Sequence, residues 1–292
     1  MDDPRKIVWL ASYPKSGNTW FRAFLTALLN PESPDIDINN LYQTTIASSR
    51  QLFDEMTGVS SADLKQEEID RIRPLVYRQN AAEAGEILYH KVHDAWTVLP
   101  GNGPLFPADV TRAVLYFIRN PLDVVVSFAH HLSAGIDKTI GIMNNNRFAL
   151  CQQTDRLPLQ IRQQILTWSR HVQSWVDYSK LPLKVIRYED MYYNGLETFK
   201  KAVSFIGFSP TDTEISKALK KSTFENLKKQ EIDKGFREKN SRSESFFRKG
   251  VPGDWKNVLS KKQINQIVKE HKNFMERFGY YPLESTNWNI FK

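Results

Sequence analysis

Cysteine is almost absent from this chain of 292 residues, which contains one, Cys151. A single cysteine cannot form an intrachain disulfide or a cysteine-rich zinc site, so a reducing compartment suits the protein. No apolar run approaches the roughly 18 residues of a membrane span, and the first residues are charged, unlike a secretion signal. We therefore expect a cytoplasmic protein without a membrane span.

The glycine-rich motifs of common nucleotide-binding proteins are also missing. A Walker A loop has the form GxxxxGK[ST], and a dinucleotide-binding loop has the form GxGxxG. After the first expected strand there is one glycine, Gly17, and the lysine of the loop, Lys15, precedes it. This pattern argues against a Walker-type NTPase and against a Rossmann dinucleotide fold.

Neither sign of charge is in strong excess. The chain has 40 Lys and Arg against 33 Asp and Glu, which gives a net charge of +7. This balance favours anionic ligands but is too mild to indicate a polynucleotide partner. We expect no nucleic acid partner.

Residues 6–30 do contain a candidate phosphate site, because an apolar strand at 7–10 runs through a polar loop into an amphipathic helix. Gly17 allows close approach of a ligand to the backbone, and the N–H groups at the start of the helix point toward it. Lys15 adds a charge, while Ser16 and Thr19 add hydroxyl donors. An ordinary turn that carries a lysine is the alternative, and the grouping of these residue types in one short loop favours the anion site.

Three further apolar strands are expected, at 87–92, 112–118 and 183–187. Helical patterns cover 65–84, interrupted at Pro74, and then 159–180, 196–230 and 260–278, whereas 31–64 is expected to be a surface excursion with short helices and 133–158 irregular. Strands that alternate with helices predict an α/β fold, in which a central parallel sheet lies between two helical layers (three-layer α/β/α). We expect a single domain over 1–292.

Ligands of such folds gather at the carboxyl ends of the strands. These ends carry Lys15, His93, Arg119 and Tyr188, which should therefore share one rim. Arg119 could hold a second anion together with Ser127, which lies on the helix opened by Pro121. For Arg119, a surface salt bridge is the alternative.

Three motifs occur in a fixed order: SYPKSGNTW at 12–20, YFIRNPLDVVVS at 116–127 and RKGVPGDWKN at 248–257. Together they resemble the cytosolic-type sulfotransferase family. Enzymes of this family move a sulfuryl group from 3'-phosphoadenosine 5'-phosphosulfate (PAPS) to a hydroxyl or amine and release 3'-phosphoadenosine 5'-phosphate (PAP). A donor with phosphate at both ends needs two separate anion sites, and the chain has a candidate for each.

The resemblance implies roles for individual residues. The P-loop-like phosphosulfate loop would contribute Lys15, Ser16, Gly17, Asn18, Thr19 and Trp20. The 3'-phosphate would be held by Arg119, Ser127, Arg248, Lys249 and Gly250. The adenine would contact Tyr188, Ser222 and Phe224, although Phe224 could equally be a core residue. Since these groups already supply positive charge, no metal is expected.

The sequence Lys91-Val92-His93 resembles the KxH of the family, whose histidine is the general base. Alternation along the strand places Lys91 and His93 on one side, and an imidazole pKa of about 6.5 suits proton removal near neutral pH. Lys15 is expected to stabilise the departing phosphate. His90 should face the other side and be structural, His130 is the competing candidate for the base, and His131 could contact the acceptor.

The expected partner is a small-molecule acceptor with a hydroxyl or amine, and nothing in 31–60 or 133–158 indicates which one. Several apolar residues could line its pocket or belong to the core: Leu41, Tyr42, Phe53, Phe128 and Phe148. The family's KxxxTVxxxE dimerisation stretch falls at 256–265, where Ser260, Lys261 and Asn265 replace Thr, Val and Glu. No dimer by that route is predicted, and the oligomeric state stays open.

Two other functions share part of this pattern. A nucleotide kinase would have a similar fold and a basic loop, but it should show Walker A and an acidic strand end for magnesium. A binding module for a nucleotide or a sulfated polymer would need the anion sites but would not need His93.

Overall fold

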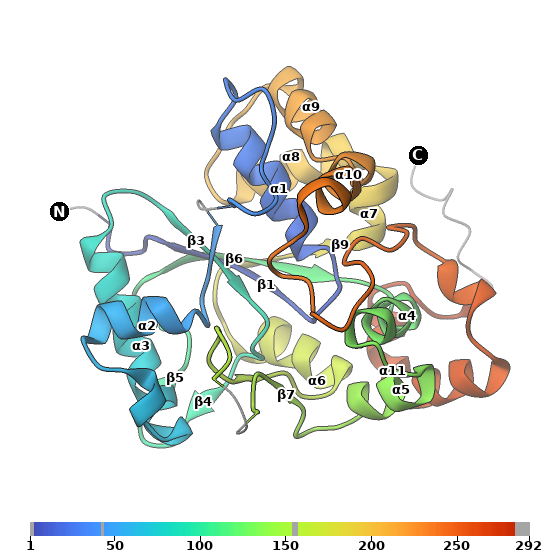
Figure 1. Ribbon diagram of the computed structural model, residues 1–292, viewed down its shortest axis with the longest axis horizontal. Helices are drawn as coiled ribbons and strands as arrows, with labels where there is room; N and C mark the ends of the chain where they lie inside the picture. The colour runs from blue at the N-terminus through green and yellow to red at the C-terminus, as the bar shows by residue number, and fades with distance from the viewer. Residues whose placement is uncertain (1–2, 42–43, 154–156, 284–292) are drawn as a thin grey trace.

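The computed structural model describes residues 3–41, 44–153 and 157–283. Its centre is a parallel sheet with strand order β2-β3-β1-β6-β9 (Figure 1). The strands are β1 (Ile7–Ser12), β2 (Thr44–Ile46), β3 (Leu88–Val92), β6 (Thr111–Ile118) and β9 (Leu183–Arg187). Two short antiparallel pairs lie outside it: β4 (Val98–Leu99) with β5 (Gly103–Pro104), and β7 (Ala149–Leu150) with β8 (Gln163–Gln164).

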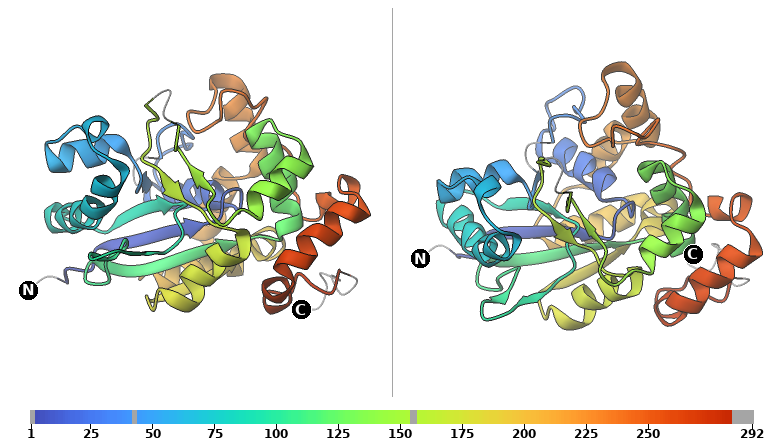
Figure 2. Two further views of the ribbon diagram at one scale, coloured as in Figure 1. Left: turned by 90° about the horizontal axis from the view of Figure 1, so that it is seen from below. Right: turned by 60° about the horizontal axis from the view of Figure 1, so that its bottom comes forward.

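Helices cover both faces of the sheet (Figures 1 and 2). Val8 and Leu10 of β1 pack in one core with α1 (Asn18–Leu29), α8 (Gly195–Phe205) and α9 (Asp212–Lys221). The alternate residues Ile7 and Trp9 belong to the other core, with α3 (Gln66–Glu83), α6 (Trp168–Gln173) and α11 (Lys261–Arg277). Because successive side chains of a strand point to opposite faces, β1 contributes residues to both cores. The predicted three-layer α/β/α fold is confirmed.

The remaining helices are α2 (Arg50–Thr57), α4 (Pro121–Leu132), α5 (Ile136–Met143), α7 (Tyr188–Tyr193) and α10 (Phe224–Lys234). Short helical turns occupy Ser61–Asp63, Ser174–Tyr178 and Asp254–Asn257. The start of α4 follows its sequence signal, since Asn120 Oδ1 accepts a hydrogen bond from Leu122 N (3.0 Å) and Pro121 is the first helical residue. Within the part of the chain that the structure describes, no helix is both long and apolar enough to cross a membrane.

Strand β2 was not predicted, because three residues are too few for a periodic pattern. It lies at the edge of the sheet beside β3 and ends next to the site. The predicted interruption of α3 at Pro74 is wrong: the helix continues through it. Proline removes one hydrogen bond to the preceding turn, but the buried Ile69, Val76 and Tyr77 keep the helix packed.

Segments 133–158 and 159–180 also differ from expectation. The first contains α5, which buries Ile140 and Met143. In the second, Ile161, Ile165 and Trp168 have helical spacing, but the helix begins only at Trp168, after the cap Thr167. The two isoleucines instead flank β8 and are buried there by tertiary packing.

The continuous helical pattern at 196–230 is divided in the structure into α8, α9 and α10. Thr211 and Thr223 cap the second and third helices, because each hydroxyl accepts a hydrogen bond from the first turn. These breaks turn the start of α10 toward the site described below.

Candidate active site

A cavity of about 770 Å³ opens at the carboxyl ends of the strands. Lys15, His93, Arg119 and Tyr188 all line it, as expected for residues at or just beyond the ends of β1, β3, β6 and β9. The predicted common rim is therefore a real cavity with cationic and imidazole side chains in its wall.

The loop between β1 and α1 has an unusual backbone. Lys15 (φ 69°) and Gly17 (φ 98°) adopt left-handed conformations, which cost free energy for residues with a Cβ and gather at functional sites. At Gly17 a Cβ would lie 2.7 Å from the Tyr188 ring, so only glycine fits here. The side-chain amide of Asn18 donates a hydrogen bond to the Leu10 carbonyl (2.7 Å) and so holds the loop in place. The backbone N–H of Asn18, the first residue of α1, is not used in this bond.

Lys15 is partly buried in a positive environment. Burial, helped by Lys91 and Arg119, lowers the pKa of Lys15 to about 7. Its ammonium group lies 3.6 Å from the centroid of the Phe246 ring. Without a bound ligand, Lys15 is therefore present in both its charged and its neutral form near pH 7.

Arg119 is buried as well, with its guanidinium 4.0 Å from the centroid of the Tyr188 ring. It donates to the carbonyls of Lys15 and Val251, each at 3.3 Å. Within residues 3–41, 44–153 and 157–283 it has no ion-pair partner, so the surface salt bridge considered for Arg119 is wrong. Ser127, on α4, lines the same cavity.

Two aspartates hold the third motif, 248–257, in place. Asp254 pairs with Arg248 and with Lys249 (2.8 Å). Burial tends to raise the pKa of Asp254, but these two hydrogen bonds outweigh it, and the pKa is lowered. From α4, Asp123 accepts hydrogen bonds from Gly253 N (2.7 Å) and Trp255 N (3.1 Å), which join the second and third motifs.

Phe224 lies in the cavity wall, packed on the backbone of Gly250, where a Cβ would come within 2.3 Å of the ring. Ser16 and Ser222 are the two predicted donor-site residues whose side chains are not part of the described lining. The Ser222 hydroxyl donates to the Ala218 carbonyl (2.9 Å), and its neighbour Thr223 lines the cavity instead.

Hydrogen bonds hold both the ring and the backbone carbonyl of His93. Its Nδ1 lies 2.9 Å from the Ser12 carbonyl, which can only accept, so Nδ1 carries the proton and Nε2 keeps its lone pair. The His93 carbonyl accepts a hydrogen bond from His171 Nε2 (3.1 Å). Burial, with Lys91 nearby, holds the pKa of His93 well below its ordinary value. The ring is therefore neutral at pH 7, and no hydrogen bond from the described residues occupies its basic Nε2.

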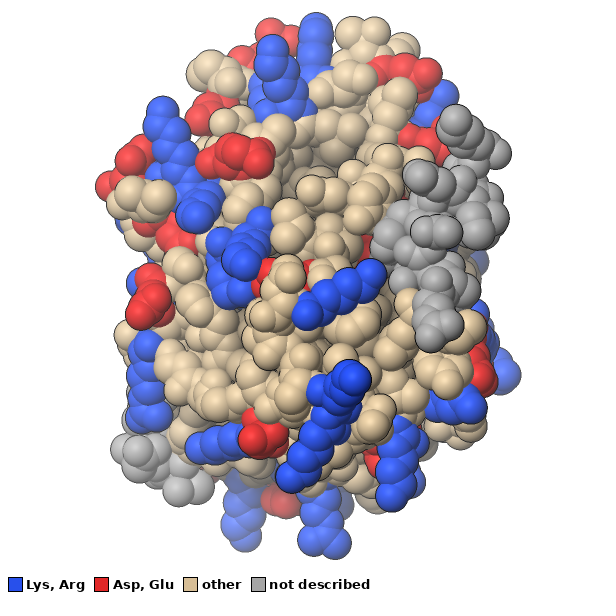
Figure 3. All heavy atoms as spheres, turned by 90° about the vertical axis from the view of Figure 1, so that its right-hand side faces the viewer, with Lys and Arg blue, Asp and Glu red and all other residues tan. Residues whose placement is uncertain are grey.

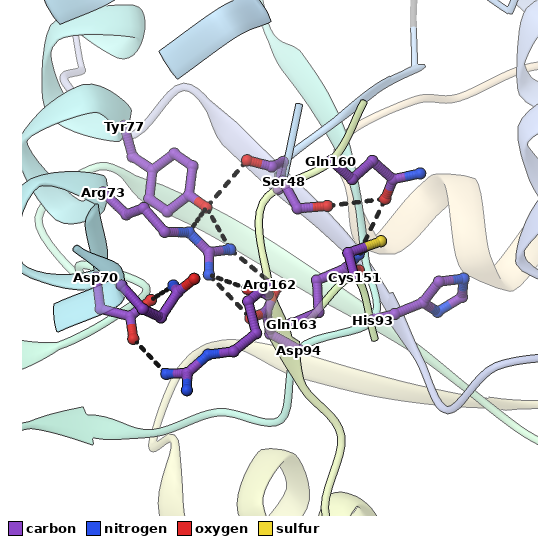
Figure 4. A network of polar contacts seen from close by, with 12 residues as sticks. Ser48, Asp70, Arg73, Tyr77, His93, Asp94, Cys151, Gln160, Arg162 and Gln163 are labelled. Atoms are coloured by element: carbon purple, nitrogen blue, oxygen red, sulfur yellow. Dashed lines mark hydrogen bonds and ion pairs between the residues drawn. The ribbon is translucent and has the colours of Figure 1, made fainter. Parts of the chain in front are cut away.

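Behind His93 lies a buried ion pair (Figure 4). Arg73 of α3 donates to both oxygens of Asp94, at 2.9 and 2.8 Å, and Trp175 Nε1 donates to the Asp94 carbonyl (3.0 Å). A loop after a strand is otherwise mobile, and these contacts fix the residue that follows the imidazole.

Lys91 lines the cavity but is paired. Glu238 binds Lys91 Nζ with one oxygen and Arg22 NH1 with the other, both at 2.6 Å. Burial raises the pKa of Glu238, but Arg22 and Lys91 together bring it well below its ordinary value. Sequence reasoning missed Glu238 because it stands in a polar segment without periodicity, and only the fold brings it to β3.

The other candidate histidines differ in their contacts and in whether they line the cavity. His90 is buried on the opposite side of β3, between Thr45 Oγ1 (2.7 Å) and Asn80 Oδ1 (3.0 Å), as its predicted structural role requires. The His130 ring is held by Ser245 (2.9 Å to the carbonyl). Within the described lining of the cavity His131 is present and His130 is not.

Of the apolar acceptor candidates, Phe128 lines the cavity, Leu41 and Phe53 are core residues, and Phe148 packs partly buried against the core. Tyr42 lies outside the described residues.

Among the residues that the structure describes, no three His, Cys, Asp or Glu side chains form a group that could hold a metal ion. On the face in Figure 3, Lys and Arg side chains stand among acidic and uncharged ones, so the charge there is mixed.

Several polar atoms at the donor side are buried without a partner in the described chain, namely Ser16 Oγ, Arg119 Nε and Arg248 Nε. Buried donors normally have an acceptor, and phosphate oxygens would supply one. The residues present therefore fit a ligand with more than one phosphate group.

Comparison with known proteins agrees with this chemistry. The family model "Sulfotransferase domain" matches residues 5–279. Flavonol 3-sulfotransferase of Flaveria bidentis is 26% identical over 276 residues, covering 90% of this chain and 79% of that protein. Cytosolic sulfotransferase 13 of Arabidopsis thaliana is 25% identical over 279 residues, covering 90% and 75%.

A solved structure of retinol dehydratase in complex with androsterone and inactive cofactor PAP has the same fold, with a TM-score of 0.62. It is 18% identical, and the match covers 94% of this chain and 82% of that one. With the family model matching nearly its whole length, the chain belongs to the sulfotransferase family, as a PAPS-dependent enzyme of the cytosolic type.

Proposed function

We propose that the protein transfers the sulfuryl group of PAPS in line to a hydroxyl or amine of a small-molecule acceptor and releases PAP, without a metal. The observation that carries this proposal is the meeting of an open basic nitrogen on His93 with the cations Lys15 and Arg119 in one cavity. One related enzyme is named for a flavonol and a structural neighbour holds androsterone, and both of these small molecules support this class.

Two groups of residues would hold the donor. The loop around Lys15, Ser16, Gly17, Asn18, Thr19 and Trp20 would bind the 5' end through its N–H groups and the ammonium. Arg119, Ser127, Arg248, Lys249 and Gly250 would bind the 3'-phosphate, where buried guanidinium nitrogens have no partner in the described chain. Tyr188 and Phe224 would contact the adenine with their rings, and Ser222 would support Phe224 from the preceding helix end.

His93 would act as the general base. Its Nδ1–H is committed to the Ser12 carbonyl, so Nε2 can take the acceptor proton, and burial keeps the ring neutral beforehand. Lys91, paired with Glu238, would stay oriented beside His93. When bound, PAPS supplies the sulfuryl group and a phosphate leaving group; Lys15 would oppose the negative charge that develops there.

The proposal also includes a cytoplasmic location and a single domain over 1–292. One relative is itself named a cytosolic sulfotransferase. The family model covers 5–279 of the proposed domain.

The function is tested by a transfer assay with labelled PAPS against a panel of phenols, sterols, amines and sugars. Titration with PAP, ATP and heparin separates the alternatives: a sulfotransferase should bind PAP far more tightly than ATP, a kinase the reverse. Selective binding of heparin without any transfer would favour a binding module and contradict the proposal.

We predict that His93→Ala abolishes transfer to hydroxyl acceptors and leaves PAP affinity within a few-fold, because the imidazole takes a proton and does not hold the nucleotide. Removing a general base costs about 10² to 10⁴ in turnover. His130→Ala is the control, since Ser245 holds its ring. If His93→Ala keeps most of its activity and His130→Ala does not, the base is His130.

A further inference from the structure

Away from the nucleotide-binding loop, one wall of the cavity is polar. Gln160 and Gln163 line it from the region of the β7–β8 hairpin, and Lys91 and Glu238 line the same cavity. Apolar residues line the cavity as well, namely Phe128, Leu132 and Phe246, together with Leu150, which pairs with Gln163 inside the hairpin. Because His93 also lines the cavity, this half is where the proposed function places the acceptor.

The backbone fixes the polar wall close to His93. Ala95 N donates to the Gln164 carbonyl (2.7 Å), which joins β8 to the loop after His93. On the other side, Ile161 N donates to the Ser48 carbonyl (2.8 Å) and Arg50 N to the Leu159 carbonyl (3.1 Å). The chain on both sides of Gln160 is therefore held, and its side chain is positioned by the fold.

The side chains of this wall are ordered by their own hydrogen bonds (Figure 4). Gln160 Oε1 accepts from Ser48 Oγ and from Gln163 Nε2, both at 3.0 Å. Figure 4 shows the Gln160 amide nitrogen pointing away from both of these partners. Among the described residues no acceptor bonds to that nitrogen, so the wall presents a fixed and unused donor.

A fixed polar group discriminates strongly between ligands. A site built to hydrogen-bond a hydroxyl rejects an analogue that lacks it, since the polar group is then desolvated without a partner. An acceptor with a single hydroxyl on an apolar skeleton satisfies His93 and leaves Gln160 unpaired. An acceptor with neighbouring hydroxyls satisfies both and still presents C–H faces to the apolar residues of the lining.

We propose that the acceptor is polyhydroxylated, of the carbohydrate class, and that the Gln160 amide binds a hydroxyl adjacent to the one that is sulfated. This rests on the proposed function and names its acceptor class. Gln160 is a specificity-determining residue here and takes no part in proton transfer.

The test compares kcat/KM for PAPS-dependent transfer to five acceptors: methyl α-glucoside, methyl α-galactoside, maltose, 2-naphthol and dehydroepiandrosterone. We expect at least one sugar to exceed both apolar alcohols. Gln160→Leu should lower kcat/KM for that sugar roughly tenfold, the scale of one lost hydrogen bond, and leave or raise the value for 2-naphthol. Gln164→Leu, an exposed residue of the same hairpin, is the matched control and should change neither.

PAP binding, measured by calorimetry on the same preparations, distinguishes failure of the carbohydrate proposal from failure of the proposed sulfotransferase function. Failure of all three sugars as acceptors would overturn the carbohydrate proposal, and the sulfotransferase proposal would stand if PAP binds and 2-naphthol turns over. An equal loss with sugar and 2-naphthol in Gln160→Leu would also overturn it, because that pattern indicates a general structural role. Absence of PAP binding would overturn the proposed function itself.

Discussion

At the residue scale, the most informative group is the Lys15 ammonium. Partial burial beside other cations lowers its pKa to about 7, and an arriving phosphate removes that penalty. We predict that PAP binding at pH 8 takes up close to one proton, because Lys15 is mostly neutral before binding and charged afterwards. Calorimetry in Hepes and in Tris measures this uptake. Since the free pKa is the lower one, PAP affinity should fall as pH rises above 7.

The control for proton uptake is Lys15→Met, which has similar length and no titration. Uptake of the same size in this variant would assign the proton to another group. Lys15→Met should also lose on the order of a hundredfold or more in turnover, with PAP affinity weakened less, since one electrostatic donor to the leaving group is missing. Unchanged turnover in single-turnover measurements would contradict that role.

At the element scale, the segment between α10 and the turn at Asp254–Asn257 crosses the site. Its position is held by a few charged side chains. Glu238 bridges Arg22 of α1 and Lys91 of β3, and Arg22 NH2 also donates to the Thr44 carbonyl of β2 (2.9 Å). From α10, the Glu231 carboxylate accepts a hydrogen bond from Phe247 N of this segment (2.9 Å). These contacts hold Phe246 over Lys15.

We predict that Glu238→Gln lowers the free energy of unfolding by about 3 kcal/mol, since two buried cations lose their counter-charge. KM for the acceptor should rise as well, because Lys91 is no longer held beside His93. Urea unfolding and steady-state kinetics measure the two effects. Glu244→Gln, an exposed glutamate of the same segment, should behave like the parent protein; equal stability of the two variants would show that the bridge contributes little.

At the scale of the whole molecule, the positive field of the donor site comes from distant parts of the chain. Lys15, Arg119 and Arg248 follow or precede different elements, and the first residues of α1, Asn18 and Thr19, line the same cavity. We predict that EDTA leaves turnover within about twofold, because these groups supply the charge that magnesium supplies in phosphoryl transfer. A strict requirement for re-added Mg²⁺ would instead favour the kinase alternative.

The sequence by itself determined the α/β architecture and the strand ends, because period-2 and period-3.6 patterns report directly which faces are buried. It also indicated Lys15, Arg119 and His93, since strand ends of a parallel sheet must meet. Only the tertiary structure decided the edge strand β2, the helix that continues through Pro74 and the hairpin at Ile161 and Ile165, because packing there outweighs local propensity. The same is true of Glu238 and Gln160. Their roles depend on partners far away in the chain, Arg22 and Ser48, and no local pattern encodes a contact over that separation.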